Sequence, residues 1–151
     1  MIVAFGCDHG GFPLKQIVIE TVQQMGNEVM DFGIYQLESV DYPDYAEKAG
    51  RALQRNEAER AIVICGSGVG ACIAGNKIKG VYACLCHDTY SARQGVEHDN
   101  MNMLCLGARI IGDELAREIV QAYLKATFST EERHRRRVGK IQKLEQSFTD
   151  Q

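Results

Sequence analysis

The sequence has no apolar run approaching the roughly 20 residues that a helix needs to cross a bilayer. Its first residues lack the basic start and cleavage site typical of a signal peptide, and instead show the pattern of a strand. Internal repeats, low-complexity tracts and long linkers are missing as well. These absences predict a cytoplasmic protein that uses no membrane, with residues 1–151 forming a single domain.

The chain also lacks an excess of positive charge. Its formal net charge of −3 argues against a general affinity for nucleic acid. The arginine run at 133–137 could bind nucleic acid, but it is short and no RNA-binding signature accompanies it. We therefore expect no nucleic-acid partner.

The six cysteines do not form the pattern of a disulfide framework. Most lie in or beside apolar strands, where cysteine in a reducing compartment acts as a small buried hydrophobe. Only Cys84-Leu85-Cys86-His87 resembles a metal motif. Strand alternation puts its two cysteines on one face and His87 on the other, and no second pair has ligand spacing. We expect no metal site.

Apolar strand-like segments alternate with helical patterns along most of the chain. Strands are expected at 2–7, 28–32, 61–65, 81–86 and 103–106. Helices are expected at 13–25 and 42–53, briefly after Gly70, at 88–97, and from a cap at Asp113 to about 128, with a loop at His98-Asp99-Asn100. This alternation predicts an α/β fold, a three-layer α/β/α, Rossmann-like sandwich with five parallel strands.

The stretch from Ala61 to Gly70 concentrates most of the chemistry. An apolar strand runs into Cys65 and then into Gly66-Ser67-Gly68-Val69-Gly70, before a short apolar helix. Backbone N–H groups at such a turn attract negative charge, and a thiol beside them ionises more easily. The same glycines would equally allow close packing of helix on sheet. The spacing is not the dinucleotide fingerprint, so a nucleotide-binding domain fits less well.

Parallel sheets bind ligands beyond the carboxyl ends of their strands. That rule brings four segments to one rim: Cys7-Asp8-His9, Cys65–Gly70, His87-Asp88 and Gly107–Arg109. Each has a plain structural alternative, such as a helix cap at Asp8 with a solvated His9. Their joint placement favours a site.

The carboxyl-terminal segment does not continue the strand–helix alternation. Ser129-Thr130-Glu131-Glu132 has the form of a capping box, and an amphipathic helix is expected over about 130–148. Its apolar stripe is Val138, Ile141, Leu144 and Phe148, with residues 133–137 on the polar side. Because it follows a complete αβ unit, we expect this helix to pack on a partner subunit.

Several motifs, taken together, resemble one family over nearly the whole chain. They are Phe5-Gly6-Cys7-Asp8-His9-Gly10-Gly11, Asp41-Tyr42-Pro43, Ile64 to Gly70, Ala74-Gly75-Asn76-Lys77, His98, Leu106-Gly107-Ala108-Arg109 and Arg133 to Val138. This set is similar to the LacAB/RpiB sugar-phosphate isomerases. The resemblance implies a five-stranded parallel sandwich, active sites at a dimer interface, and no metal or other cofactor.

The resemblance also implies roles for individual residues. Cys65 matches the base that moves a proton between C1 and C2 of a phosphorylated sugar, and His98 matches the residue that aids ring opening. The remaining matches are the anion hole for the enediolate (Gly66, Ser67, Gly68, Val69, Gly70), the sugar hydroxyls (Asp8), the phosphate (His9, Arg133, Arg137) and the lining of the site (Tyr42, Arg109).

One departure concerns the residues after His98. Many relatives read Asn-Asp-x-Asn there, whereas this chain reads Asp99-Asn100-Met101-Asn102, so a carboxylate or Asn100 would face the sugar. The expected substrate is ribose 5-phosphate, because the chain carries a complete set of site residues. Galactose 6-phosphate and allose 6-phosphate are alternatives, and so is a non-catalytic sensor of a sugar phosphate. A homodimer or a dimer of dimers is expected.

Overall fold

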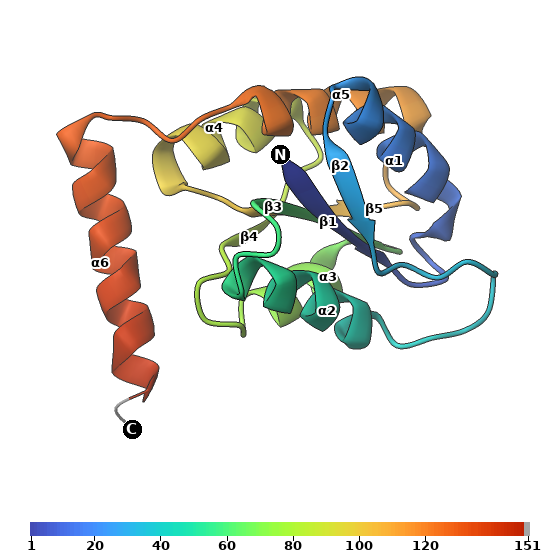
Figure 1. The fold of residues 1–151 in the computed structure, drawn as a ribbon, viewed down its shortest axis with the longest axis horizontal. Coiled ribbons are helices and arrows are strands. Elements are labelled where there is room, and N and C mark those ends of the chain that lie inside the picture. The colour runs from blue at the N-terminus through green and yellow to red at the C-terminus, as the bar shows by residue number, and fades with distance from the viewer. Residues whose placement is uncertain (150–151) are drawn as a thin grey trace.

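The computed structural model describes residues 1–149, without the side chain of Thr149, and contains one five-stranded, all-parallel sheet of order β2-β1-β3-β5-β4 (Figure 1). The strands are β1 (Ile2–Cys7), β2 (Glu28–Asp31), β3 (Arg60–Cys65), β4 (Ala83–Leu85) and β5 (Met103–Gly107). The helices are a 3-10 turn η1 (Phe12–Leu14), α1 (Lys15–Gln24), α2 (Tyr42–Gln54), α3 (Val69–Gly75), α4 (Thr89–Asp99), α5 (Asp113–Lys125) and α6 (Glu132–Thr149). The predicted α/β sandwich is confirmed.

The central strands end together. β3 lies between β1 and β5, with Cys7 paired to Ile64 and Cys65 paired to Gly107. All three strands point the same way, so the chain segments that leave them emerge side by side at one edge of the sheet. We call this edge the carboxyl rim.

Helices cover both faces of the sheet (Figure 1), and an apolar cluster fills the space on each face. Helices α1, α4 and α5 cover one face, where Phe5, Ile62 and Leu104 point into the core. Helices α2 and α3 cover the other, where alanines of α2 meet Val63 and Cys105. Alternation along each strand supplies both faces, as expected for strands buried on both sides. None of the helices within residues 1–149 is long and apolar enough to span a bilayer.

Two predicted boundaries were wrong around β4 and α4. Strand β4 begins at Ala83 rather than Val81, because the side chain of Asn102 accepts the N–H of Tyr82 in place of a strand neighbour. The predicted loop at 98–100 is helical through Asp99, and only Asn100, with φ 55°, leaves the helix. Asparagine tolerates this left-handed conformation, which ends α4.

Helix α5 is shorter than predicted at its carboxyl end. Asp113 is its first helical residue rather than its cap, and the helix stops at Lys125, not near Phe128. Arg60 explains the stop, since its guanidinium donates to the carbonyls of Tyr123 and Ala126, the latter at 2.6 Å. These carbonyls at the helix end lack helical partners, and a cation there is favourable.

Helix α6 stands beside the sandwich rather than in either layer (Figure 1). Among the elements of the sandwich, α4 makes the main contact with it, and Glu145 Oε1 accepts the N–H of Gly80 at 2.8 Å. Val138 is buried, but Ile141, Leu144 and Phe148 are exposed, Phe148 by 76%. Of the four residues of the predicted apolar stripe, one is thus covered by residues 1–149 and three are exposed.

Replacing Arg60 by Met should lower the free energy of unfolding by about 1.5–3 kcal/mol, because two carbonyls of α5 lose a charged donor. Urea unfolding at fixed protein concentration measures this. Arg55→Met is the matched control, since the Arg55 side chain is 66% exposed and reaches Glu57 only at 4.0 Å. An unchanged urea midpoint for Arg60→Met would show that Arg60 does not anchor α5.

Candidate active site

The chain makes a sharp turn where β3 ends at the carboxyl rim. Gly68 adopts φ 82°, a left-handed conformation that disfavours side chains, and α3 begins at the next residue. A Cβ on Gly68 would lie 2.5 Å from a methyl carbon of Leu85 and 2.9 Å from the backbone of Leu106. Gly68 therefore faces the sheet and shapes the turn, rather than lining an open site.

Cys65 lies at the inner end of this turn and is only 4% exposed. The N–H of Gly68 donates to its Sγ at 3.1 Å, which fixes the sulfur against the turn. Ser67 Oγ accepts the N–H of Val69 at 3.3 Å. The N–H groups of Ser67 and Gly70 donate to no acceptor within residues 1–149, which leaves donors beside the thiol.

The glycines at the rim also allow close backbone packing. A Cβ on Gly107 would lie 2.6 Å from the Ser67 carbonyl, and one on Gly10 would lie 2.9 Å from the Gly66 nitrogen. The Tyr42 ring occupies the place of a side chain on Gly70, at 2.4 Å. Close packing, the structural alternative for the glycine-rich stretch, is therefore confirmed, and anion binding by the same loop stays a prediction.

Asp8 and His9 follow β1 and are held by the backbone. Asp8 is buried, and its Oδ1 accepts the N–H of Gly11 at 2.9 Å in the turn before η1. The predicted alternative of a helix cap at Asp8 is wrong, because the N-cap residue of η1 is Gly11. The Nδ1 of His9 accepts the N–H of Val40 at 3.2 Å. In a neutral imidazole with Nδ1 as acceptor, the proton lies on Nε2. His9 can then donate a hydrogen bond from Nε2.

Two cavities at the carboxyl rim share a wall made by Asp8, Tyr42, Gly66 and Arg109. The first, of about 540 Å³, also contains His9 and residues 39–44 and is called the His9 cavity. The second, of about 510 Å³, is called the Cys65 cavity; its further lining is Cys65, Ser67, Val69, Gly70, Ile73 and Ile110.

Arg109 gives this double cavity its positive charge. The backbone N–H of Arg109 donates to the Gly66 carbonyl at 3.0 Å, which fixes the residue over the glycine-rich turn. Its guanidinium makes no ion pair within residues 1–149. An unpaired guanidinium is available to an anion. We call the residues around both cavities the rim site.

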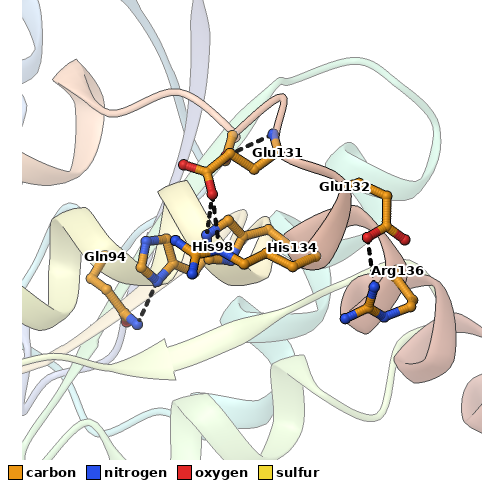
Figure 2. Close-up of polar contacts among 8 residues, drawn as sticks. Gln94, His98, Glu131, Glu132, His134 and Arg136 are labelled. Atoms are coloured by element: carbon orange, nitrogen blue, oxygen red, sulfur yellow. Dashed lines mark hydrogen bonds and ion pairs between the residues drawn. The ribbon is translucent and has the colours of Figure 1, made fainter.

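A second group of polar residues lies between α4 and α6, and we call it the histidine cluster (Figure 2). The rings of His98 and His134 stack at 3.9 Å with 17° between their planes. Gln94 Nε2 lies 3.0 Å from His98 Nδ1, and Glu131 Oε2 lies 3.8 Å from His134 Nε2. Burial, then the neighbouring His98 and Arg133, lower the pKa of His134.

The prediction that His134 lies on the polar side of α6 is wrong. Its side chain is only 4% exposed. It precedes Val138 by four residues and so shares the buried face of the helix. That spacing was the signal that could have identified it.

The charged residues around the histidine cluster differ in whether their side chains are already paired. Arg133 Nε donates to Glu131 at 2.8 Å, and Arg136 pairs with Glu132 (Figure 2). The side chain of Arg137 is exposed and forms no hydrogen bond or ion pair within residues 1–149. Asp99 is exposed in the last turn of α4, beside His98, and Asn100 follows it.

Within one chain, the structure separates the rim site from the histidine cluster. Cys65 ends β3, whereas the turn after His98 meets the start of that strand, where Ala61 N–H donates to the Asn102 carbonyl at 2.8 Å. Four strand residues of about 3.3 Å each separate these points by about 13 Å. Thus nine predicted residues gather in the rim site, while His98, Asp99, Asn100, Arg133 and Arg137 lie toward the opposite edge.

His87 lies at the carboxyl rim as predicted, but lines neither cavity of the rim site. Its Nε2 accepts the N–H of Gly107 at 2.9 Å, and burial lowers its pKa. It therefore supports the end of β5. Over the described part of the chain, no three His, Cys, Asp or Glu side chains gather as metal ligands.

The sequence profile of the Ribose/Galactose Isomerase family matches residues 3–141. The chain is 42% identical over 144 residues to ribose-5-phosphate isomerase B of Escherichia coli, covering 95% of this chain and 96% of the relative. It is 40% identical over 127 residues to D-erythrulose-4-phosphate isomerase of Pectobacterium atrosepticum, covering 83% and 84%.

A solved structure shows the same likeness. Ribose-5-phosphate isomerase B of Clostridium thermocellum superimposes with a TM-score of 0.94 at 44% identity, covering 98% of this chain and 99% of that one. Likeness over the whole length in both sequence and structure establishes membership, and the chain belongs to the ribose/galactose isomerase family.

Proposed function

We propose that this protein is an aldose–ketose isomerase that interconverts ribose 5-phosphate and ribulose 5-phosphate. The observation that carries the proposal is Cys65, whose Sγ accepts a backbone N–H at the floor of a cavity lined by Arg109. Family membership supports the reaction class, and the relatives named ribose-5-phosphate isomerase B support the five-carbon substrate.

The proposed reaction moves one proton along the sugar. The Cys65 thiolate removes the proton from C2 of the open-chain aldose, and the C2–H electron pair forms the C1–C2 double bond of an enediolate. Charge develops on O1, where the free N–H groups of Ser67 and Gly70 are suited to stabilise it. Cys65 returns the proton to C1, while a proton leaves O2 and one reaches O1. No external oxidant or reductant is consumed.

The rim site also provides groups for the unreactive part of the substrate. His9 offers its Nε2–H and Arg109 its unpaired guanidinium, both suited to a phosphate. Asp8, buried at the shared wall, is suited to accept from a sugar hydroxyl. A fixed phosphate would orient C1 and C2 over Cys65.

We further propose that the chain forms a homodimer in which the histidine cluster of one subunit completes the rim site of its partner. Two observations support this. His98 and Arg137 lie toward the opposite edge of the sheet from Cys65 in their own chain. Exposed apolar side chains occur both beside the Cys65 cavity, at Val69, Ile73 and Ile110, and along α6. A two-fold dimer would form two such composite sites.

In such a composite site, the partner's residues would act on the ring and on the phosphate. We assign ring opening to His98, where Gln94 holds Nδ1 and leaves Nε2 toward the substrate. Arg137, unpaired in its own chain, is assigned to the phosphate together with Arg133. Asp99 and Asn100 would contact the sugar.

The first test replaces Cys65 by Ala and measures isomerisation of ribose 5-phosphate with EDTA present. We expect kcat to fall by roughly 10²–10⁴-fold, the usual contribution of a general base. Deuterium incorporation at C1 and C2 in heavy water should disappear with it. Near-normal turnover by the variant would overturn the mechanism, and a wild-type protein that binds ribose 5-phosphate without exchange would be a sensor.

Cys72→Ala is the matched control. Hydrogen bonding to Cys105 lowers the pKa of Cys72 to about 6, yet Cys72 lines neither cavity of the rim site. Its loss should leave turnover unchanged. A panel of ribose 5-phosphate, D-erythrulose 4-phosphate, galactose 6-phosphate and allose 6-phosphate then tests the substrate, with the highest kcat/KM expected for ribose 5-phosphate.

Subunit mixing tests the composite site. Cys65→Ala and His98→Ala should each be inactive alone, whereas their mixed dimer regains one intact site. Random mixing of equal amounts should restore about a quarter of wild-type activity, because half the dimers are mixed and each has one working site. Sedimentation measures the oligomeric state. Mixed dimers without activity would place Cys65 and His98 in the same chain's site.

Arg137→Ala should mainly raise KM for ribose 5-phosphate. Losing a charged hydrogen bond of about 1.5–3 kcal/mol corresponds to a rise of roughly 10–150-fold, with kcat little changed. Arg136→Ala is the neighbouring control, since Arg136 is already paired with Glu132 at 2.5 Å. A fall in kcat at constant KM would contradict a phosphate-binding role.

A further inference from the structure

The loop at 33–41, between β2 and α2, lies against the rim site from outside. Ser39, Val40 and Asp41 line the His9 cavity, whereas residues 33–36 and Glu38 line a separate cavity of about 630 Å³. Most of the loop is exposed, including Tyr35 and Leu37 at 73% and 71%. Because so many of its side chains are exposed, the position of the loop depends on a small number of contacts.

Lys15, the first residue of α1, holds the beginning of this loop. Its Nζ donates to the Ile34 carbonyl at 2.7 Å and pairs with Asp31 Oδ2 at 3.0 Å, and it lies 3.9 Å from the centre of the Tyr35 ring. The Lys15 and Asp31 side chains are 12% and 20% exposed. Asp31 Oδ1 in turn accepts the N–H of Gly33 at 2.8 Å. One largely buried cation thus joins α1, β2 and the loop.

The end of the loop holds His9. The N–H of Val40 donates to His9 Nδ1 at 3.2 Å, across 31 residues of sequence. A backbone N–H cannot accept a hydrogen bond, so this contact requires a lone pair on Nδ1 and puts the proton of neutral His9 on Nε2. The bond also fixes the plane of the ring. Both effects determine how His9 presents a donor to the His9 cavity.

We propose that the 33–41 loop is a positioning element for substrate binding. The Val40 N–H selects the Nε2–H tautomer and ring orientation of His9, and Lys15 acts at a distance by anchoring the loop. This inference rests on the proposed function in one respect, the assignment of His9 to the phosphate. Val40 and Lys15 are positioning residues, because neither is assigned a contact with the substrate.

A purely structural role for the loop makes a different prediction. Ile34 is buried and packs in the same apolar cluster as Phe5 and Cys7, so the loop also covers core. Were that its whole role, loosening it would lower stability while the His9 tautomer and the affinity for phosphate stayed unchanged. The experiments therefore measure the tautomer and KM directly.

The first experiment determines the tautomer of His9 by two-bond ¹H–¹⁵N correlation in the uniformly labelled full chain, with His9→Gln used for assignment. The wild-type protein should show His9 protonated on Nε2. Val40→Pro removes the N–H and should give a mixture of tautomers, whereas Val40→Ala retains the N–H and should match the wild type. A wild-type His9 protonated on Nδ1, or a single unchanged tautomer in Val40→Pro, would overturn the proposal.

The second experiment compares kinetic constants. Val40→Pro should raise KM for ribose 5-phosphate about 3- to 10-fold, the range for losing one well-placed hydrogen bond, with kcat little changed. The inhibition constant of inorganic phosphate should rise by a similar factor. Val40→Ala should behave as the wild type. A different outcome is a variant with mixed tautomers but an unchanged KM and an unchanged inhibition constant of phosphate. That result would show that His9 does not bind the phosphate, although Val40 would still determine its tautomer.

Lys15→Met keeps the test decisive if Val40→Pro does not fold. It retains the aliphatic stem and removes the ammonium group, so the tautomer should become mixed and KM should rise in the same direction. Lys125→Met is the matched control, since Lys125 is exposed at the end of α5. A Lys15→Met variant that is less stable but keeps the wild-type tautomer and KM would show that the anchor is structural only. A chain without isomerase activity would refute the proposed function, while the tautomer measurement would still test the Val40 contact.

Discussion

The common direction of the five strands is the constraint on which the rest of the structure depends. Parallel strands joined by helices bring every strand end to one edge and every helix end to the other. Cys65 ends β3, His9 and Arg109 follow β1 and β5, and all three meet at the carboxyl rim. His98 lies in the last turn of α4, and so is near the amino ends of the strands. Within one chain, the direction of the strands thus holds the rim site and the histidine cluster apart.

Close backbone contact at the rim follows from the pairing of β3 with β5. Cys65 is opposite Gly107, and the turn after Cys65 then passes over the end of β5 with no room for a side chain. Position matters more than acidity among the cysteines. The pKa values of Cys72 and Cys84 are lowered, but among the cysteines of residues 1–149 it is Cys65 that lines the rim site, with unpaired amides beside it.

Much of the fold and of the rim site could be predicted from the sequence, because the patterns that indicate them are local. Five apolar strands alternating with helices determined the fold class, and the rule for strand ends brought Asp8, Cys65 and Arg109 together. Features that depend on distant contacts were missed. The end of α5 is determined by Arg60, more than 60 residues away in the sequence. The burial of His134 depends on stacking against His98, although the spacing to Val138 hinted at it.

Helix α6 has a consequence for how the protein responds to dilution. Helix α6 leaves Leu144 and Phe148 exposed, and nothing within residues 1–149 covers this apolar surface. With the proposed composite sites, a subunit separated from its partner would keep its folded sandwich but hold two incomplete halves of different sites. Specific activity would then follow the law of mass action, falling as the total concentration nears the dissociation constant, and substrate bridging two subunits would oppose that loss.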